Sequence, residues 1–278
     1  MISIPDLPKA LDTGLRNKLD DRNNSVLHVS DLSVALSDGN CPRALWLRLR
    51  GAAKRPLTAG MLLLFDHGHR IHERLIEVLG IGLVDGWHIQ NVEQKIELPG
   101  PVYGRYDALL KGAKGERIIV DFKTIRGRAF GYLTEAKPSN VLQVQGYIKG
   151  ADVDSGLVFY VDREGQNQAR QFSVERDDDA VRSATSFAME IRDRECAPDI
   201  LQPKLDIGKN KGPDSVKLRM PWQCSYCQYI DVSCPGALAK NLRELGIIGY
   251  IDGDFAPKKG FGKLAELVGS LRDDVIPF

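Results

Sequence analysis

The chain has 278 residues, of which 43% are hydrophobic and 27% are charged, a composition typical of a soluble globular protein with a full core. Its 38 basic and 37 acidic residues leave a net charge of +1, so any attraction for a polyanion must be local. No apolar run approaches the roughly 18 residues of a membrane helix, and the start of the chain lacks the pattern of a signal peptide. We therefore expect a cytoplasmic protein without a membrane segment. The lack of a Gly-x-x-x-x-Gly-Lys-Ser/Thr phosphate loop argues against a motor activity.

The first part of the chain is predicted to be a lead-in followed by two short helices. Residues 1–28 are interpreted as a flexible lead-in, and Ser30 can cap a helix that reaches Leu36. Cys41 and Pro42 open a second helix, since proline is favoured in the first helical turn. Residues 39–65 then lack acidic side chains but hold several basic ones: Arg43, Arg48, Arg50, Lys54 and Arg55. This stretch is either a patch that follows DNA phosphates, through Arg43 and Arg48, or a solvated helix face.

A long helix from about Gly60 to Leu79 is predicted from its apolar stripe. His72 lies on this stripe, one turn after Gly68, which leaves open space beside the histidine. His67 and His69 point elsewhere and are predicted to be surface residues. A histidine on an apolar stripe is either a satisfied core residue or a metal ligand, and the pattern leaves both interpretations open.

Three consecutive strands are predicted next, from alternating or continuous apolar residues: 91–98, 102–110 and 118–124. The last two form a hairpin around a turn at 112–115. If Lys111 pairs with Arg117, Asp107 falls directly opposite Asp121, with about 5 Å between their Cβ atoms. A slip of one residue would separate the two carboxylates, so the register is an inference.

This pair of carboxylates indicates a metal centre. Asp107 and Asp121 repel each other in apolar surroundings unless a cation lies between them, and their oxygens suit a hard divalent ion such as Mg²⁺ or Mn²⁺. Lys123 shares the face of Asp121, where it can stabilise charge on a phosphate and help to hold the attacking water. The competing interpretation is a solvated strand face with an ordinary Asp–Lys pair.

The rest of the chain is predicted to mix helices and strands. Arg126 and Arg128 add positive charge after the hairpin, close enough to the expected metal centre to contact DNA. A helix that begins at Pro138 places Gln143 and Tyr147 on one face, where they can hold a nucleotide backbone and orient the lysine of the hairpin. Tyr147 can equally be a half-buried aromatic residue. The remaining elements are two strands, a helix and a long basic loop: 157–161, 168–175, 177–195 and 197–221.

The five cysteines of this chain favour metal or cluster ligation over a disulfide framework. Cys224, Cys227 and Cys234 form a triplet with the spacing of metal ligands. A fourth ligand must come from Cys41 or Cys196. Choosing Cys41 would clasp the two ends of the domain together and leave Cys196 as an ordinary thiol. Zinc at the same cysteines is the competing possibility.

Four motifs, in this order and spacing, resemble those of the RecB-like nucleases of the PD-(D/E)XK superfamily: Gly68-x-x-x-His72, Gly104-x-x-Asp107, Asp121-x-Lys123 and Gln143-x-x-x-Tyr147. The sequence Cys41-Pro42-Arg43 and the cysteine triplet resemble the iron–sulfur subgroup, which includes CRISPR-adaptation exonucleases and nuclease domains attached to repair helicases. The resemblance covers about residues 29–236. Each motif is weak alone, and the combination is specific.

The resemblance implies an α/β fold with a PD-(D/E)XK restriction-endonuclease-like core, in which helices flank a mixed central sheet. It implies that Lys123 is the catalytic lysine and that Gln143 and Tyr147 belong to the active site. The implied metal ligands are three side chains and one backbone carbonyl: His72, Asp107, Asp121 and Phe122. The implied 4Fe–4S cluster is held by four thiolates: Cys41, Cys224, Cys227 and Cys234.

The expected function is that of a divalent-metal-dependent exonuclease acting on single-stranded DNA or DNA ends. It would serve recombination, repair, or CRISPR or phage DNA processing, with a helicase, recombinase or CRISPR-adaptation partner. Two alternatives stay open: a non-catalytic DNA-end-binding accessory protein, and a structure- or sequence-specific endonuclease. We expect a nuclease domain at 29–240 that includes the iron–sulfur clasp, and a tail at 241–278 without an assigned role.

Overall fold

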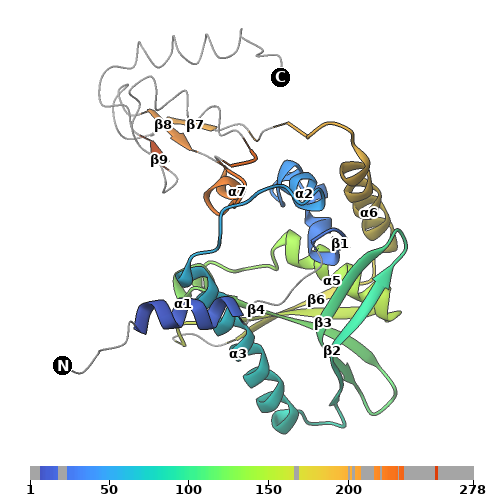
Figure 1. Cartoon of the computed structure of the whole chain (residues 1–278). Coiled ribbons are helices and arrows are strands. Elements are labelled where there is room, and N and C mark those ends of the chain that lie inside the picture. Colours follow the sequence, from blue (N-terminus) through green and yellow to red (C-terminus); the bar gives the residue numbers. More distant parts are fainter. Residues whose placement is uncertain are drawn as a thin grey trace, which may run out of the picture. The chain divides into compact units, whose positions relative to one another are not determined.

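The structure is a computed structural model (Figure 1) that describes residues 7–17, 24–165, 169–199, 201, 204–207, 216–219, 221–230, 232–234 and 254–255. The chain divides into two compact units, Met1–Gly51 with Pro56–Ala197, and Ala52–Arg55 with Pro198–Phe278. No helix in these described ranges combines the length and apolar character that a membrane span needs.

The first unit is built on a six-stranded mixed sheet. Its strands run in the order β1-β3-β4-β5-β6, and β2 pairs with β3 as a further branch. The pairs β1–β3 and β4–β5 are parallel, and the other pairs are antiparallel. The strands span Leu27–His28 (β1), His88–Leu98 (β2), Val102–Lys111 (β3), Arg117–Ile125 (β4), Ser155–Asp162 (β5) and Arg170–Glu175 (β6). The predicted mixed central sheet is therefore confirmed.

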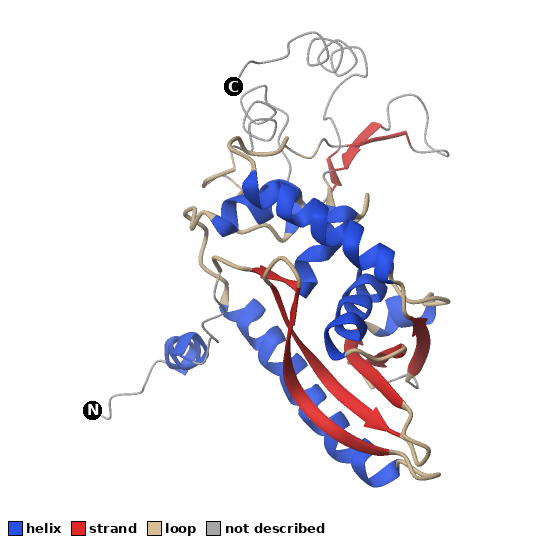
Figure 2. Cartoon of the chain, turned by 90° about the vertical axis from the view of Figure 1, so that its right-hand side faces the viewer, coloured by secondary structure: helices blue, strands red, loops and turns tan. Residues whose placement is uncertain are grey.

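Helices cover both faces of this sheet (Figures 1 and 2). Ile119 and Val120 are consecutive in β4 and so point to opposite faces. Val120 packs beneath the long helix α3, whereas Ile119 joins the larger core formed with η1, α5 and α6. The helices span Leu7–Asn17 (α1), Val29–Ala35 (η1), Pro42–Leu49 (α2), Ala59–Gly82 (α3), Gly127–Gly131 (α4), Pro138–Ala151 (α5) and Asp178–Asp193 (α6).

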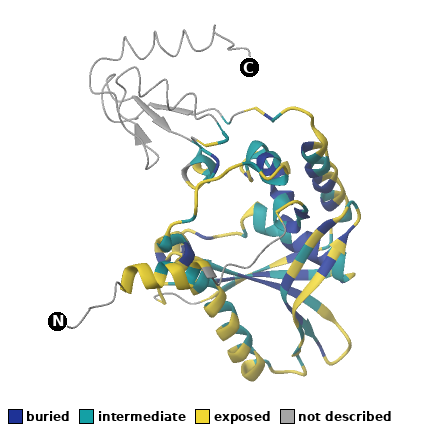
Figure 3. Ribbon diagram, viewed as in Figure 1, coloured by how far each residue is buried: buried dark blue, intermediate teal, exposed yellow. Residues whose placement is uncertain are grey.

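The two faces of the sheet are buried to different degrees. Figure 3 shows dark blue, buried residues on α6 and on the strands, while much of α3 is yellow and exposed. Leu75, Ile76 and Leu79 are the apolar residues of α3 that pack against the small cluster that contains Val120 and Phe122. The predicted helix at about 60–79 is thus confirmed as α3, whose apolar stripe is narrow because it covers few strand residues.

Three local features differ from the sequence expectations. The helix after residue 28 is a 3₁₀ helix whose N-terminus is capped through Asp31, which accepts from the His28 N–H at 2.7 Å, and not through Ser30. The predicted lead-in contains helix α1. The prediction of one long loop at 197–221 is wrong, because residues 204–207 and 216–219 pair as strands. Alternating apolar residues mark both strands, but lysines and prolines dominate the stretch and hide the pattern.

The second unit holds a three-stranded sheet, of which one strand comes from the tail. Its order is β7-β8-β9, with β7 at Lys204–Ile207, β8 at Val216–Arg219 and β9 at Asp254–Phe255; helix α7 spans Trp222–Ser225. Segment 52–55 is tied into this unit, since the Gln228 side chain donates to the Arg55 carbonyl at 2.7 Å and Ser233 donates to the Ala53 carbonyl at 2.6 Å. The rest of the predicted tail at 241–278 lies outside the described residues.

Candidate active site

The β3–β4 hairpin brings Asp107 beside β4, as the turn predicts. Lys111 pairs with Arg117, and the ladder continues to Ala108 opposite Val120, which confirms the predicted register. The Asp107 carboxylate accepts a hydrogen bond from the Phe122 N–H at 2.6 Å. At the end of the ladder a side-chain oxygen therefore replaces a backbone carbonyl as the acceptor, and this bond holds Asp107 against the strand that carries Asp121.

Asp121 is a deeply buried ionisable group at this site. Its side chain is 3% exposed and lies 2.7 Å from the Lys123 ammonium, which confirms that the two residues share a face. The Asp121 Oδ2 has no hydrogen-bond partner in the described part of the chain, so the contact is an ion pair outside hydrogen-bond geometry. Burial raises the pKa of Asp121 to about 6, while Lys123 opposes the rise and Asp107 adds to it.

His72 reaches the same place from helix α3. Its Nδ1 lies 3.6 Å from the Asp107 carboxylate, and its ring meets the Phe122 ring edge-on with 5.7 Å between centroids. A Cβ added to Gly68 would meet no atom within 4 Å, so open space does lie one turn before the histidine. The exposed positions of His67 and His69 are also as predicted. The structure thus brings together His72, Asp107, Asp121 and Lys123.

Gln143 and Tyr147 share a face of α5, as predicted. The Gln143 Nε2 donates to the Tyr147 hydroxyl at 2.7 Å. Tyr147 is only 5% exposed and belongs to the main core, where a Cβ on Gly104 would approach its ring to 3.0 Å. The tyrosine is therefore more deeply buried than either sequence interpretation assumed, and Gln143 is the half-buried member of the pair.

The donors at this site fit a hard divalent cation in type. Two carboxylates and one imidazole are suitable ligands, and the buried Asp121 Oδ2 is an acceptor that a cation would satisfy. In the arrangement described here the Lys123 ammonium balances that charge instead. No three histidine, cysteine, aspartate or glutamate side chains in the described ranges are placed to hold a metal ion. The ligand set, including the Phe122 carbonyl, stays a prediction.

The four arginines predicted to contact DNA differ in their surroundings. Arg126 and Arg128 follow β4 directly and are exposed. Arg48 is engaged inside the first unit, because its guanidinium donates to the Asn24 and Val26 carbonyls and pairs with Asp31 at 2.5 Å. Arg43 lies half-buried on α2. Their contacts with DNA stay predictions, and Arg126 and Arg128 are the two that solvent reaches most freely.

The cysteines lie in both units of the chain. Cys41 is the N-cap of α2 in the first unit. In the second unit the Cys227 N–H donates to the Cys224 carbonyl, and the Cys234 N–H donates to the Tyr229 carbonyl at 2.8 Å, so the triplet lies on two successive turns. None of the five cysteines forms a disulfide bond, and Cys196 is exposed. A shared cluster stays a prediction.

Glu93 is a residue at this site that the sequence reasoning missed. Val92 pairs with Ala108 and Gln94 with Tyr106, which places Glu93 across from Asp107 in β2. It forms an ion pair with Arg105 at 2.6 Å, and its backbone has a left-handed φ of 52°. Burial raises the pKa of Glu93, with Arg105 opposing the rise. Extending the predicted pairing of strands 91–98 and 102–110 would have placed Glu93 opposite Asp107. No residue in the sequence predicts its left-handed backbone conformation.

Comparisons with known proteins give only distant similarities. No protein-family model matches the chain, and no curated protein matches it. Among solved structures it is similar to the protein SSO0001, with 16% identity and a TM-score of 0.48 over 82% of this chain and 94% of the other.

Two exonuclease structures are also similar. The alkaline exonuclease LHK-Exo of Laribacter hongkongensis, in its complex with dAMP, has 15% identity and a TM-score of 0.45 over 60% of this chain and 88% of its own. A phage-related exonuclease of Haemophilus somnus has 16% identity and a TM-score of 0.42 over 60% and 93%. All these TM-scores are below 0.5, so the similarities assign no function to this chain.

Proposed function

We propose that this chain is a divalent-metal-dependent exonuclease of the RecB-like PD-(D/E)XK type that hydrolyses phosphodiester bonds in single-stranded DNA. The main support is the meeting of His72, Asp107, Asp121 and Lys123 at the end of one strand ladder. Two carboxylates, an imidazole and an ammonium are the groups that metal-assisted phosphodiester hydrolysis needs. A buried carboxyl group with a raised pKa weakens the fold, so its position favours a functional role.

Each residue of the site has a distinct role in this proposal. His72, Asp107 and Asp121 would hold the metal ion, with the Phe122 carbonyl as a further ligand. A bound divalent ion supplies Lewis acidity and a water molecule of lowered pKa. Lys123 would turn from Asp121 toward the scissile phosphate, where its ammonium stabilises the charge that develops during in-line attack.

The surrounding residues would position the DNA. Gln143, held by its hydrogen bond to Tyr147, would orient the substrate backbone or Lys123. Arg126 and Arg128 would contact phosphates next to the cut. We also propose that the protein works in the cytoplasm beside a helicase, a recombinase or the CRISPR-adaptation machinery. A 4Fe–4S cluster on the four cysteines named above would be structural.

The test is cleavage of end-labelled single-stranded DNA with Mg²⁺ or Mn²⁺, using protein purified without oxygen. We expect Asp121→Ala and Lys123→Ala to lose at least about 100-fold in rate, as when a group that stabilises transition-state charge is removed. The exposed residues Asp199 and Lys114 provide matched controls, Asp199→Ala and Lys114→Ala, which should cut like wild type. Which labelled end disappears first gives the polarity.

The products distinguish this proposal from its rivals. Release of single nucleotides supports an exonuclease, and defined fragments would favour an endonuclease. If the wild type binds DNA ends but no form of the protein cuts them with either metal, the nuclease proposal is wrong. A non-catalytic end-binding protein would then be the better account.

A further inference from the structure

A row of paired residues leads from the candidate active site across the sheet to its edge. Lys123 on β4 pairs with Tyr160 on β5, which in turn pairs with Arg170 on β6. Side chains that are paired in register point to the same face of a sheet, so Arg170 shares the face of Lys123. Two strand spacings of about 4.8 Å separate their backbones by about 10 Å.

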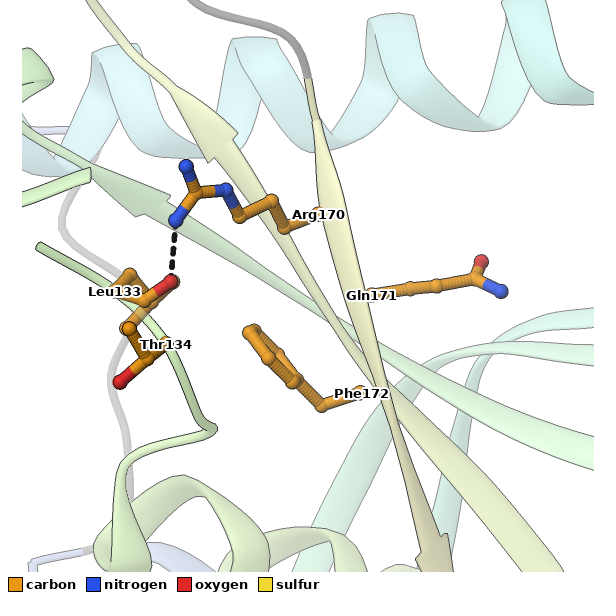
Figure 4. Close-up of a pocket in the computed structure, with 5 residues that line it drawn as sticks. All are labelled: Leu133, Thr134, Arg170, Gln171 and Phe172. Atoms are coloured by element: carbon orange, nitrogen blue, oxygen red, sulfur yellow. Dashed lines mark hydrogen bonds between the residues drawn. The ribbon is translucent and has the colours of Figure 1, made fainter. Parts of the chain in front are cut away.

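A pocket of about 380 Å³ lies at the end of this row (Figure 4). Figure 4 shows the side chains of Arg170 and Phe172 turned toward the chain at Leu133 and Thr134, whereas Gln171 points away. Arg170 donates to the Leu133 carbonyl, and its guanidinium lies over the Phe130 ring, 4.8 Å from the centroid. The pocket therefore has a cationic wall that is fixed in place by two contacts.

The groups that line the pocket suit a nucleotide. A guanidinium carries five N–H donors, and one is used by the Leu133 carbonyl, so donors remain for a phosphate. The exposed Thr134 adds a hydroxyl group at the rim. Phe172 is half-buried, with its ring held edge-on against Tyr160 at 5.8 Å, and contributes an aromatic surface.

The segment between the active site and the pocket has the composition of a single-strand binding surface. Arg126 and Arg128 are exposed, and Glu135 is the one acidic residue between positions 126 and 137. Tyr132 lies directly before Leu133 and is 77% exposed. This short stretch therefore carries an exposed aromatic ring and two exposed cationic side chains, the kinds of group on which single-stranded bases stack and to which phosphates are attracted.

We propose that Tyr132 and this pocket form a subsite for single-stranded DNA, on which a base stacks while Arg170 and Thr134 hold a phosphate. The inference rests on the proposed function, because the strand bound here would be the one cut beside Lys123. The subsite would therefore hold the strand a few nucleotides from the cut.

The experiment measures binding of a fluorescent oligothymidine to the full chain by anisotropy in EDTA, where no cleavage occurs. We expect Tyr132→Ala to weaken binding by about fivefold or more, and Tyr132→Phe to bind like wild type because the ring is kept. Ile81→Ala, at a residue 82% exposed near the end of α3, is the control for loss of an exposed apolar side chain and should not change binding. Arg128→Gln should reduce the slope of log affinity against log salt by about 0.7.

The outcomes separate this inference from the proposed function. Equal binding by the wild type and Tyr132→Ala would overturn the subsite, and so would a wild type that does not bind the oligonucleotide, whatever the cleavage assay gives. Tyr132-dependent binding by a protein that cuts no DNA with Mg²⁺ or Mn²⁺ would support the subsite and contradict the nuclease.

Discussion

At the scale of single residues, the burial of Asp121 has the largest expected effect on stability. Its carboxyl group is buried among apolar neighbours, and the Lys123 ammonium does not fully compensate for the lost hydration. The same burial that would make Asp121 a strong metal ligand therefore makes the metal-free protein sensitive to pH. Asp107 and His72 also act on this group, in opposite directions.

We predict that the metal-free protein loses stability as the pH rises from about 4 to about 6. Burial raises the pKa of Asp121 from 3.8 to about 6, so in this window the folded state holds a proton that the unfolded state has released. Stability must then fall with rising pH, by about 3 kcal/mol at ~1.4 kcal/mol per pH unit, and this contribution stays constant above the folded pKa.

Urea unfolding in EDTA across this range tests the prediction. Asp121→Asn should not show this loss of stability between about pH 4 and about pH 6. It should be more stable than the wild type above about pH 6, because no buried charge forms. Asp199→Asn, at an exposed position, should follow the wild type. Identical pH profiles for the wild type and Asp121→Asn would contradict the assignment.

At the scale of elements, one buried amide joins α5 to the junction of β6 and α6. Gln145 is 7% exposed; its Nε2 donates to the Glu175 carbonyl and its Oε1 accepts from the Asp177 N–H at 2.8 Å. Asp177 caps α6 by accepting from the N–H groups of the next turn. The ion pairs nearby, such as Lys149 with Asp178, are more exposed and contribute less.

We predict that Gln145→Leu lowers the free energy of unfolding by about 2–5 kcal/mol, because two backbone groups lose their buried partner. Gln94→Leu, at an exposed position on β2, is the matched control and should change stability by less than about 0.5 kcal/mol. Denaturant midpoints with unchanged slopes would measure both effects. A Gln145→Leu midpoint equal to that of the control would show that water replaces the amide.

At the scale of the whole molecule, the proposed cluster would link residues from both units. Cys41 and Cys224 are 183 positions apart in the sequence, so a shared cluster closes a very long loop and should stabilise the fold. Within the second unit, the turns at residues 224–234 are already bonded to segment 52–55. A ligand set that spans both units would make folding depend on iron.

We predict that Cys41→Ser and Cys224→Ser each bleach the brown colour of the anaerobic protein and reduce its soluble yield. Cys196→Ser, the control at an exposed thiol, should keep both colour and iron. Visible absorption and metal analysis are the measurements. A colourless wild type with one bound zinc would show that the cysteines hold zinc and not a cluster. Bleaching by Cys196→Ser, but not by Cys41→Ser, would show that Cys196 is the fourth ligand.

Local patterns in the sequence predicted most of the elements and half of the site. Period-two alternation places Asp121 and Lys123 on one face of β4, and the turn after Lys111 sets the register that brings Asp107 beside that strand. These inferences work because they depend on neighbours along the chain or on one short turn. The pattern fails at 204–219, where basic residues mask short alternating strands.

What the sequence determined by itself was therefore the hairpin, its paired carboxylates and the helix that carries His72. The tertiary structure decided the approach of His72 to Asp107, the deep burial of Tyr147, the place of Glu93 and the pocket beside Arg170. These features depend on how elements distant in the chain pack against each other. Side-chain directions and burial at such contacts follow from close packing in three dimensions, which no periodicity along the chain records.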